Sequence, residues 1–371
     1  MQADPQNSSA EVLRNRILSF TFNQTKVIAN QTLLCIGTTM GFRIVRIEDC
    51  KITSARDKLD GQHFEGGFSC VSSMFSTQLI CIVGSPENTH QTPNILYFWD
   101  EYHSQLKAEI RFRSTVKNVL MRRDKIVIVL EKIVNHIQTY IYLLNTLKPI
   151  ASISTIENDY GVGSISTDPE VFVLGTLDTT KGHVRIENFY TNEIKRGHMH
   201  DNNIVIMEMN SSGTLAASAS ELGTVIRVFD TRTLNVMYEL RRGTSAARIT
   251  SIAFSPEGSF LIATSNKSTV HIWNLNLVNN DGYTGMVTRF LPTYFQYTRS
   301  YFKLNIQPEN RWSFSDLVPP GPVACFTSES VFCVAHLDGN LYTCRINADT
   351  ATIEKSSSFI DMDEVYRIES K

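Results

Sequence analysis

Two stretches of the sequence, MEMNSSGTLAASASELGTVIRVFD (residues 207–230) and IAFSPEGSFLIATSNKSTVHIWN (residues 252–274), are copies of one pattern. Each holds an apolar strand, a polar turn with glycine, a strand of small and apolar residues, and a second polar turn. A third, alternating strand then ends in an aromatic residue followed by Asp or Asn. Gly213 precedes Gly258 by 45 residues, and Thr224 precedes Thr269 by 45 residues. This spacing and ending are typical of the four-stranded blades of a β-propeller.

Five further stretches follow the same order of strands and turns less closely. They are TLLCIGTTMGFRIVRIED (32–49), LICIVGSPENTHQTPNILYFWD (79–100), DKIVIVLEKIVNHIQTYIYLLN (124–145), EVFVLGTLDTTKGHVRIENF (170–189) and SVFCVAHLDGNLYTCRIN (330–347). With the two clear copies they make seven blades, a number that closes a ring. Helical periodicity is nearly absent, and two unrelated β-sandwiches would not explain the 45-residue spacing. The sequence therefore predicts an all-β, WD40-like, seven-bladed β-propeller over residues 15–353.

Three segments fall outside the predicted blades. Residues 1–14 are polar, and we expect a disordered N-terminal tail. Residues 354–371 are rich in serine and then acidic, and we expect a flexible C-terminal tail. Residues 277–312 form an insertion within the sixth blade, where a tight hairpin would otherwise lie. A loop of this length in a compact domain is usually functional or disordered.

Composition limits the classes of partner. Charged residues make up 19% of the chain and the formal net charge is −2, so no global field attracts nucleic acid. The seven cysteines are scattered and form no C-x-x-C pair, which is typical of thiols in a reducing compartment. The sequence shows neither a signal peptide nor an apolar run of the roughly 18 residues that a membrane span needs. We expect a soluble intracellular protein that binds no nucleic acid.

No pattern in the sequence predicts an enzyme. A G-x-S-x-G elbow and a P-loop are absent, and GVGS at Gly161 lacks the strand-to-helix setting of a dinucleotide site. His198 and His200 form an H-x-H pair, but no further ligands cluster with them in the sequence. We therefore predict no catalytic residues, no metal site and no cofactor.

The chain crosses from the fifth blade to the sixth through ELRRG (239–243), which holds two adjacent arginines. Successive residues of an extended strand point to opposite sides, so Arg241 and Arg242 should lean toward different blades, and Gly243 should permit the turn. The matched turns of the two blades offer hydroxyl and amide groups to each guanidinium. Such donors form an oxyanion cradle that suits phosphate. In the structural alternative, Glu239 or Glu221 pairs with the arginines.

The stretch ELRRGTSAARITSIAFSPEGSFLIATSNKSTVHIW (239–273) resembles the defining region of the PROPPINs, the WIPI proteins of autophagy. These proteins carry F/L-R-R-G between blades five and six of a seven-bladed propeller. The likeness continues through MRRDKIVIVL (121–130), GTLAASASELGTVIRVFDT (213–231) and RWSFSDLVP (311–319). Leu240 replaces the commoner phenylalanine, and with DKIVIVL and RWSF this is similar to the WIPI branch that partners the rod-shaped autophagy lipid-transfer protein.

The resemblance implies two sites for phosphatidylinositol 3-phosphate or the 3,5-bisphosphate, on either side of the arginine pair at a membrane-facing rim. The first would combine Arg241 with His200, Ser220, Gly223 and Thr224. The second would combine Arg242 with Thr244, Ser265, Lys267 and Thr269. Ser268 departs from the family pattern, because it replaces the glycine that is common in the turn of blade six.

Within the insertion, YTGMVTRFLPTYFQYTRSYFKL (283–304) has no acidic residue and many aromatic ones. At 100° per residue, one helical face collects the apolar side chains, among them Phe290, Leu291, Tyr294, Phe295, Tyr301 and Phe302. A basic face lies opposite, as in helices that lie at a membrane interface. The alternative is an apolar stripe packed on the flank of the propeller. The family resemblance favours insertion into bilayers.

These observations predict a non-catalytic phosphoinositide effector in autophagy that recruits other autophagy proteins for autophagosome formation. The resemblance implies a cytoplasmic protein bound peripherally to preautophagosomal or endosomal membranes, with the lipid-transfer protein as a partner. The alternative is a generic WD40-like interaction scaffold whose arginine pair is structural.

Overall fold

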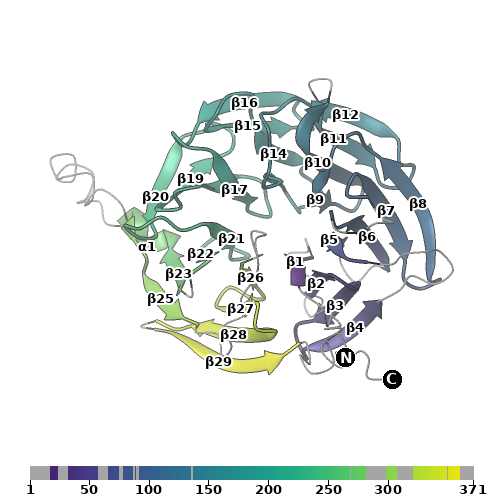
Figure 1. The fold of residues 1–371 in the computed structure, drawn as a ribbon. Helices are drawn as coiled ribbons and strands as arrows, with labels where there is room; N and C mark the ends of the chain where they lie inside the picture. Colours follow the sequence, from purple (N-terminus) through teal and green to yellow (C-terminus); the bar gives the residue numbers. More distant parts are fainter. Residues whose placement is uncertain are drawn as a thin grey trace, which may run out of the picture.

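The computed structural model describes residues 17–23, 32–56, 66–74, 78–86, 88, 92–134, 137–267, 269–280, 298–306, 321–348 and 350–359. In this part of the chain, seven sheets surround a central axis like the blades of a propeller (Figure 1). The predicted all-β, seven-bladed propeller is therefore confirmed.

Each blade is a mainly antiparallel sheet whose strands follow one another from the centre outward. Blade one holds β1 (Ile17–Phe22), β2 (Leu33–Thr38), β3 (Phe42–Arg46) and β4 (Lys51–Arg56). Blade two holds β5 (Phe68–Ser73), β6 (Leu79–Gly84), β7 (Ile95–Asp100) and β8 (Gln105–Arg111). Blade three holds β9 (Val116–Met121), β10 (Lys125–Val134), β11 (Ile137–Leu143) and β12 (Pro149–Ile153). Blade four holds β13 (Gly163–Ile165), β14 (Val173–Leu177), β15 (His183–Asn188) and β16 (Glu193–His198).

The remaining blades contain the two clear repeats and the last copy. Blade five holds β17 (Ile204–Met209), β18 (Leu215–Ser220), β19 (Val225–Asp230) and β20 (Val236–Arg241). Blade six holds β21 (Ile249–Phe254), β22 (Phe260–Ser265), β23 (Thr269–Asn274) and, after the insertion, β25 (Phe302–Asn305). Blade seven holds β26 (Val323–Phe326), β27 (Val331–Ala335), β28 (Asn340–Ile346) and β29 (Ala351–Ser358).

Burial explains the composition of the strands. The inner strand β2 is buried along its whole length, whereas the outer strand β16 is exposed at all but one residue. Apolar side chains form seven clusters, and each cluster joins two neighbouring blades. One of them packs Cys333 and Leu341 of blade seven against Ile17 and Leu34 of blade one, so the same apolar packing closes the ring. The innermost strands of all seven blades line a central cavity of about 950 Å³.

The repeat that predicted the fold also has matching backbone geometry. Gly213 and Gly258 lie in the turns between the first two strands of blades five and six, with φ angles of 69° and 78°. Glycine adopts this left-handed region without the penalty that other residues incur. The 45-residue spacing thus reflects two equivalent turns.

The last blade extends beyond the boundary expected from the sequence. Strand β29 runs to Ser358, and the next residue, Phe359, is buried against Phe20 with ring centroids 5.9 Å apart. The flexible tail expected from residue 354 therefore cannot begin there, because residues 354–358 complete the fourth strand of blade seven. The expected tails over 1–14 and from 360 onward lie outside the described residues.

The insertion in blade six is shorter than expected. A short helix α1 (Leu275–Asn280) follows β23, and the chain is described again from β24 (Thr298–Arg299), which pairs with β20 in parallel. Strand β25 then pairs with β23, with Phe302 opposite Ile272. The predicted amphipathic helix is therefore wrong from residue 298 onward, because the chain there supplies the fourth strand that blade six needs.

Two of the six proposed membrane-inserting residues fall in this returning segment. Phe302 is half-buried and packs in the cluster between blades six and seven, so it belongs to the core of the propeller. Tyr301 is 47% exposed, and its hydroxyl donates to the carbonyl of Ala348 at 3.3 Å. Phe290, Leu291, Tyr294 and Phe295 lie outside the described residues.

Candidate functional site

The turn between β18 and β19 needs a glycine. Gly223 has a φ angle of 56°, and its N–H donates to the carbonyl of Ser220 at 2.8 Å. A Cβ atom at Gly223 would lie 1.9 Å from the carbonyl oxygen of Ala247, which belongs to the connection from blade five to blade six. The glycine therefore lets this turn lie directly against that connection, where the two arginines stand.

Arg242 holds the turn and the connection together. Its backbone N–H donates to the carbonyl of Thr224 at 2.9 Å, and its Nε donates to the carbonyl of Gly223 at 2.9 Å. Its Nη2 donates to the carbonyl of Ser245. The side chain is buried, and burial lowers the pKa of Arg242. Among the described residues, these acceptors are neutral and take two of the five side-chain N–H groups of Arg242.

Ser245 connects Arg242 to the matching turn of blade six. The Ser245 hydroxyl accepts a hydrogen bond from Nζ of Lys267 at 2.8 Å, and the Lys267 N–H donates to the hydroxyl of Ser265 at 3.3 Å. Thr244 is exposed beside them, and Thr269 begins β23. Hydrogen bonds thus connect Arg242, Ser245, Lys267 and Ser265 in one chain.

Arg241 faces the other way. It ends β20 opposite Val225, and Glu239 of the same strand lies opposite Arg227, so Arg241, Glu239 and Arg227 share one face of blade five. Ser218 lies opposite Arg227 on the next strand, which places Ser218 and Ser220 on the same face. The opposite face carries Leu240, which packs toward blade six. Arg242 follows the end of this strand, and its guanidinium contacts the carbonyls of Gly223 in the blade-five turn and Ser245 in the connection.

His200 lies beside this face as a neutral ring. A hydrogen bond of 3.0 Å joins its Nε2 to the hydroxyl of Ser218. Burial, with the positive charge of Arg227, lowers the pKa of His200 to about 4. At neutral pH the histidine therefore offers a hydrogen bond without a charge. Its direct partner is Ser218, which the sequence analysis did not select, although Ser218 and Ser220 alternate on one strand.

Glu239 pairs with Arg227 of the neighbouring strand. Its carboxylate accepts a hydrogen bond from Nε of Arg227 at 2.7 Å, and Arg227 also donates to the carbonyl of Met199. The acid is therefore used within the outer strands of blade five, as the register of β19 and β20 requires.

Gly243 differs from the expectation. A Cβ atom there would meet nothing within 4 Å, and its φ angle is not in the left-handed region. Neither the backbone nor neighbouring atoms require this glycine for the turn, so the predicted role of Gly243 is wrong. The tight approach occurs at Gly223 instead.

The segment that returns from the insertion adds three polar residues to this region. Strand β24 places Arg299 opposite Arg241. The hydroxyl of Ser300 lies 3.3 Å from Nδ1 of His271, and Lys303 pairs with His271 on β25. Burial, followed by the charges of Lys303 and Arg242, lowers the pKa of His271 to about 4. Basic side chains of blades five and six thus converge at one end of these two blades.

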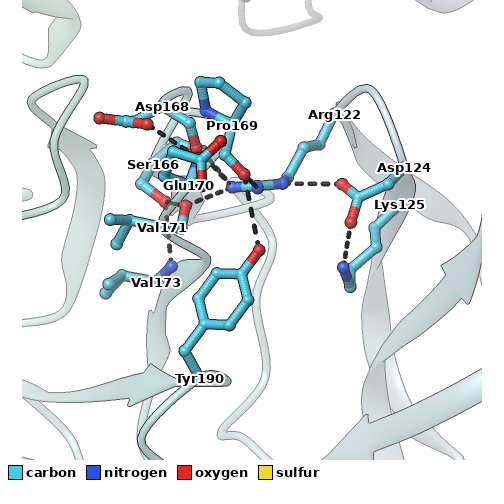
Figure 2. Close-up of polar contacts among 10 residues, drawn as sticks. All are labelled: Arg122, Asp124, Lys125, Ser166, Asp168, Pro169, Glu170, Val171, Val173 and Tyr190. Atoms are coloured by element: carbon cyan, nitrogen blue, oxygen red, sulfur yellow. Dashed lines mark hydrogen bonds and ion pairs between the residues drawn. The ribbon is translucent and has the colours of Figure 1, made fainter.

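The other basic motif, at residues 121–125, links two blades. Arg122 is buried, and its guanidinium donates to the backbone carbonyls of Ser166, Asp168, Pro169 and Val171 in blade four (Figure 2). Its Nε donates to Asp124 at 2.8 Å, and the guanidinium carbon lies 5.2 Å from the ring centre of Phe172. Tyr190 contacts the same loop through the carbonyl of Pro169. These contacts give Arg122 a structural role between blades three and four.

The described residues contain neither a cluster of metal-ligating side chains nor a membrane-spanning helix. This part of the chain holds no group of three or more His, Cys, Asp or Glu side chains arranged for a metal ion. It also holds no helix that is both long and apolar enough to cross a membrane.

Comparison with known proteins identifies the family. The model of the PROPPIN family matches residues 17–294. The chain belongs to the PROPPIN family. It is 32% identical over 262 residues to SVP1-like protein 2 of Neurospora crassa. The aligned region covers 70% of this chain and 56% of that protein. It is 26% identical over 338 residues to autophagy-related protein 18e of Arabidopsis thaliana, covering 90% and 84% of the two chains.

A solved structure supports the fold of this PROPPIN. The complex of KlAtg21 with the coiled-coil of AgAtg16 matches at a TM-score of 0.67 with 21% identity, over 93% of this chain and 100% of that one. The family resemblance stated from the LRRG motif is confirmed. The more specific likeness to one WIPI branch stays a prediction.

Proposed function

We propose that this PROPPIN is a non-catalytic phosphoinositide effector that binds phosphatidylinositol 3-phosphate or the 3,5-bisphosphate on membranes. The observation that supports the proposal is the set of basic and hydroxyl side chains around the LRRG pair. Arg241 lies on the face of blade five opposite Leu240, and Arg242 is buried between the turn of blade five and Ser245, whose hydroxyl accepts from Lys267. Two sites built on one motif suit two phosphorylated headgroups in one membrane plane.

In the first site, Arg241 supplies the charge, and Ser220 lies at the same end of the blade. Gly223 and Thr224 complete the proposed site, although their carbonyls accept from Arg242. His200 is neutral and adds hydrogen bonding through its link to Ser218. In the second site, Arg242 and Lys267 supply two charges. Thr244, Ser265 and Thr269 add the hydroxyl groups.

Arginine suits this task better than lysine at both positions. Its planar fork can donate two parallel hydrogen bonds to one phosphate, and a charge-assisted hydrogen bond contributes on the order of 1.5–3 kcal/mol. A single headgroup site would therefore bind only modestly. Two sites on one surface act together, and the combined affinity can exceed that of each site by roughly 10²–10⁴.

The insertion is proposed as a third membrane contact. Phe290, Leu291, Tyr294 and Phe295 remain the proposed inserting residues, with basic residues near them in the sequence. Phe302 is excluded, because it packs in the blade.

We further propose that the protein acts at preautophagosomal or endosomal membranes and recruits autophagy proteins, with the autophagy lipid-transfer protein as one partner. The likeness to an autophagy-related protein of Arabidopsis supports an autophagy role. The likeness to KlAtg21, solved in complex with the coiled-coil of AgAtg16, supports the use of protein partners. A generic scaffold with a structural arginine pair is the competing function.

The test is flotation with phosphatidylcholine vesicles that carry phosphatidylinositol 3-phosphate. The wild-type protein should float with these vesicles, and the Arg241→Ala, Arg242→Ala double variant should remain unbound. Circular dichroism and thermal unfolding check that the variant is folded at the assay temperature, because Arg242 also holds two backbone carbonyls. Undiminished flotation of the folded double variant would support the generic scaffold instead.

A further inference from the structure

Strand β24 brings a third arginine to the LRRG motif from a segment far along the chain. Thr298 pairs with Leu240 and Arg299 pairs with Arg241, and the two strands run parallel. Paired residues of neighbouring strands project to the same face of a sheet. Leu240 is fully buried toward blade six, so Arg241 and Arg299 share the opposite face.

This pairing places the backbone positions of two arginines opposite each other on one face. Neighbouring strands lie about 4.8 Å apart, and like charges directly opposite each other destabilise a sheet. An anion that lies between two such arginines accepts hydrogen bonds from each. A phosphate group has enough oxygens to take a fork from both arginines.

The residues that follow Arg299 belong to the same region. Ser300 reaches His271, and Lys303 lies opposite His271, whose pKa is also lowered by the charge of Arg242. The returning segment therefore contacts the surroundings of both arginines. Its position is fixed by strand pairing on both sides, to β20 and to β23.

We propose that Arg299 is a phosphate-binding residue that shares one phosphate with Arg241. This inference rests on the proposed phosphoinositide function and deepens its first site. The shared phosphate would tie β24 to the edge of blade five, so occupancy of the headgroup site stabilises the end of the insertion.

The experiment measures binding of four proteins to phosphatidylcholine vesicles that carry phosphatidylinositol 3-phosphate. They are the wild type, Arg241→Ala, Arg299→Ala and the variant with both changes. We expect each single change to weaken binding by about 10- to 100-fold, the effect of losing a charge-assisted contact. Residues that share one partner are not additive, so the double variant should bind about as weakly as either single variant.

Arg232→Ala is the matched control. It removes one exposed arginine from the turn at the other end of β19 and β20, and its binding should equal that of the wild type. Arg299→Lys keeps the charge but loses the fork, so it should recover only part of the binding. Thermal unfolding should be unchanged in Arg299→Ala, because β24 pairs through its backbone.

Several outcomes overturn the inference. If Arg299→Ala binds the vesicles as well as the wild type, Arg299 does not bind phosphate, and the proposed function is unaffected. Independent, multiplying losses in the double variant would show that the two arginines do not share a phosphate. Failure of the wild type to bind the lipid would contradict the proposed function and this inference together. Inhibition of vesicle binding equally well by inorganic phosphate and by inositol 1,3-bisphosphate would assign the site to free phosphate.

Discussion

Gly223 and Gly243 lie close together in the structure, yet only one is required by the backbone. Gly223 adopts a left-handed φ angle and lies against the carbonyl of Ala247, whereas Gly243 has open space around it. Arg242 bonds to the Gly223 carbonyl, so the position of the arginine depends on the turn that Gly223 makes possible.

We therefore predict that Gly223→Ala lowers the free energy of unfolding by about 3 kcal/mol, through strain and a backbone clash. The matched change Gly243→Ala should stay within about 0.5 kcal/mol of the wild type. Urea unfolding of the two variants measures both values. Equal stability of the two variants would contradict this account of the turn.

The buried histidines link stability to pH. The pKa of His200 is lowered to about 4 in the folded protein, below the ordinary value of roughly 6.5 in the unfolded chain. The unfolded state therefore takes up protons first as the pH falls. The stability that neutral His200 contributes is complete above pH 6.5 and is lost as the pH falls toward 4.

Between pH 7 and pH 5, His200 should thus reduce the free energy of unfolding by about 2 kcal/mol. His200→Gln does not titrate in this range and should show a smaller loss. Urea unfolding at the two pH values compares the proteins, and His271 contributes a similar slope to both. An identical loss in His200→Gln would mean that His200 titrates normally.

For single residues, the sequence indicated which charged side chains are important but not which carbonyl and hydroxyl groups hydrogen-bond to them. Alternation along the strand places Arg241 on the face opposite Leu240, and the separation of Arg241 from Arg242 into two sites stays a prediction. The carbonyls of Gly223 and Ser245, which hold Arg242, have no sequence signal, because every residue carries a carbonyl and only the folded turns aim these two. Ser218 was missed for the same reason, since its hydroxyl meets His200 only after β17 and β18 pair.

Among the elements, the loop at residues 166–171 of blade four is hydrogen-bonded to blade three. Arg122 of blade three donates to four carbonyls of this loop, and Asp124 contacts its Nε (Figure 2). A buried carbonyl that loses its hydrogen-bond donor is left unsatisfied, and this destabilises the fold by the free energy of its desolvation. The contact therefore stabilises the junction between blades three and four.

Arg122→Ala should lower the free energy of unfolding by about 3 kcal/mol, because it leaves several buried groups without this donor. Its neighbour Arg123 is exposed, and Arg123→Ala should change stability by less than about 0.5 kcal/mol. Chemical denaturation distinguishes the two. A small effect of Arg122→Ala would show that the loop is held by its other contacts.

The elements that the sequence misplaced lie at the ends of the predicted segments. Strands between turns were recognisable as short apolar runs wherever both faces of a blade are packed. Residues 298–305 instead read as part of an aromatic helix, because Tyr301 and Phe302 fit a helical face as well as a strand. Pairing with β20 and β23 decided between the two, and such long-range pairing leaves no local pattern.

For the whole molecule, the ring determines the function that we propose. Apolar clusters between every pair of neighbouring blades hold blades five and six side by side, so both arginine groups keep a fixed separation. Fixed sites that face one surface gain from effective concentration. Binding should therefore rise more steeply with the surface density of the lipid than binding through one site.

This cooperation can be tested by removing one exposed or half-exposed cation from each group. Arg241→Ala and Lys267→Ala should each flatten the dependence of vesicle binding on lipid density. Their thermal unfolding should remain close to that of the wild type, because Lys267 is exposed and Arg241 is only partly buried. Dependence on density that is unchanged in both variants would contradict a two-site surface.

The most direct measurement of the central claim is flotation of the wild type and the Arg241→Ala, Lys267→Ala double variant with two kinds of vesicle. One kind carries phosphatidylinositol 3-phosphate and the other carries unphosphorylated phosphatidylinositol. We predict that the wild type floats only with the phosphorylated lipid and that the double variant floats with neither. Equal flotation of the wild type with both lipids, or full binding by the folded double variant, would contradict the account.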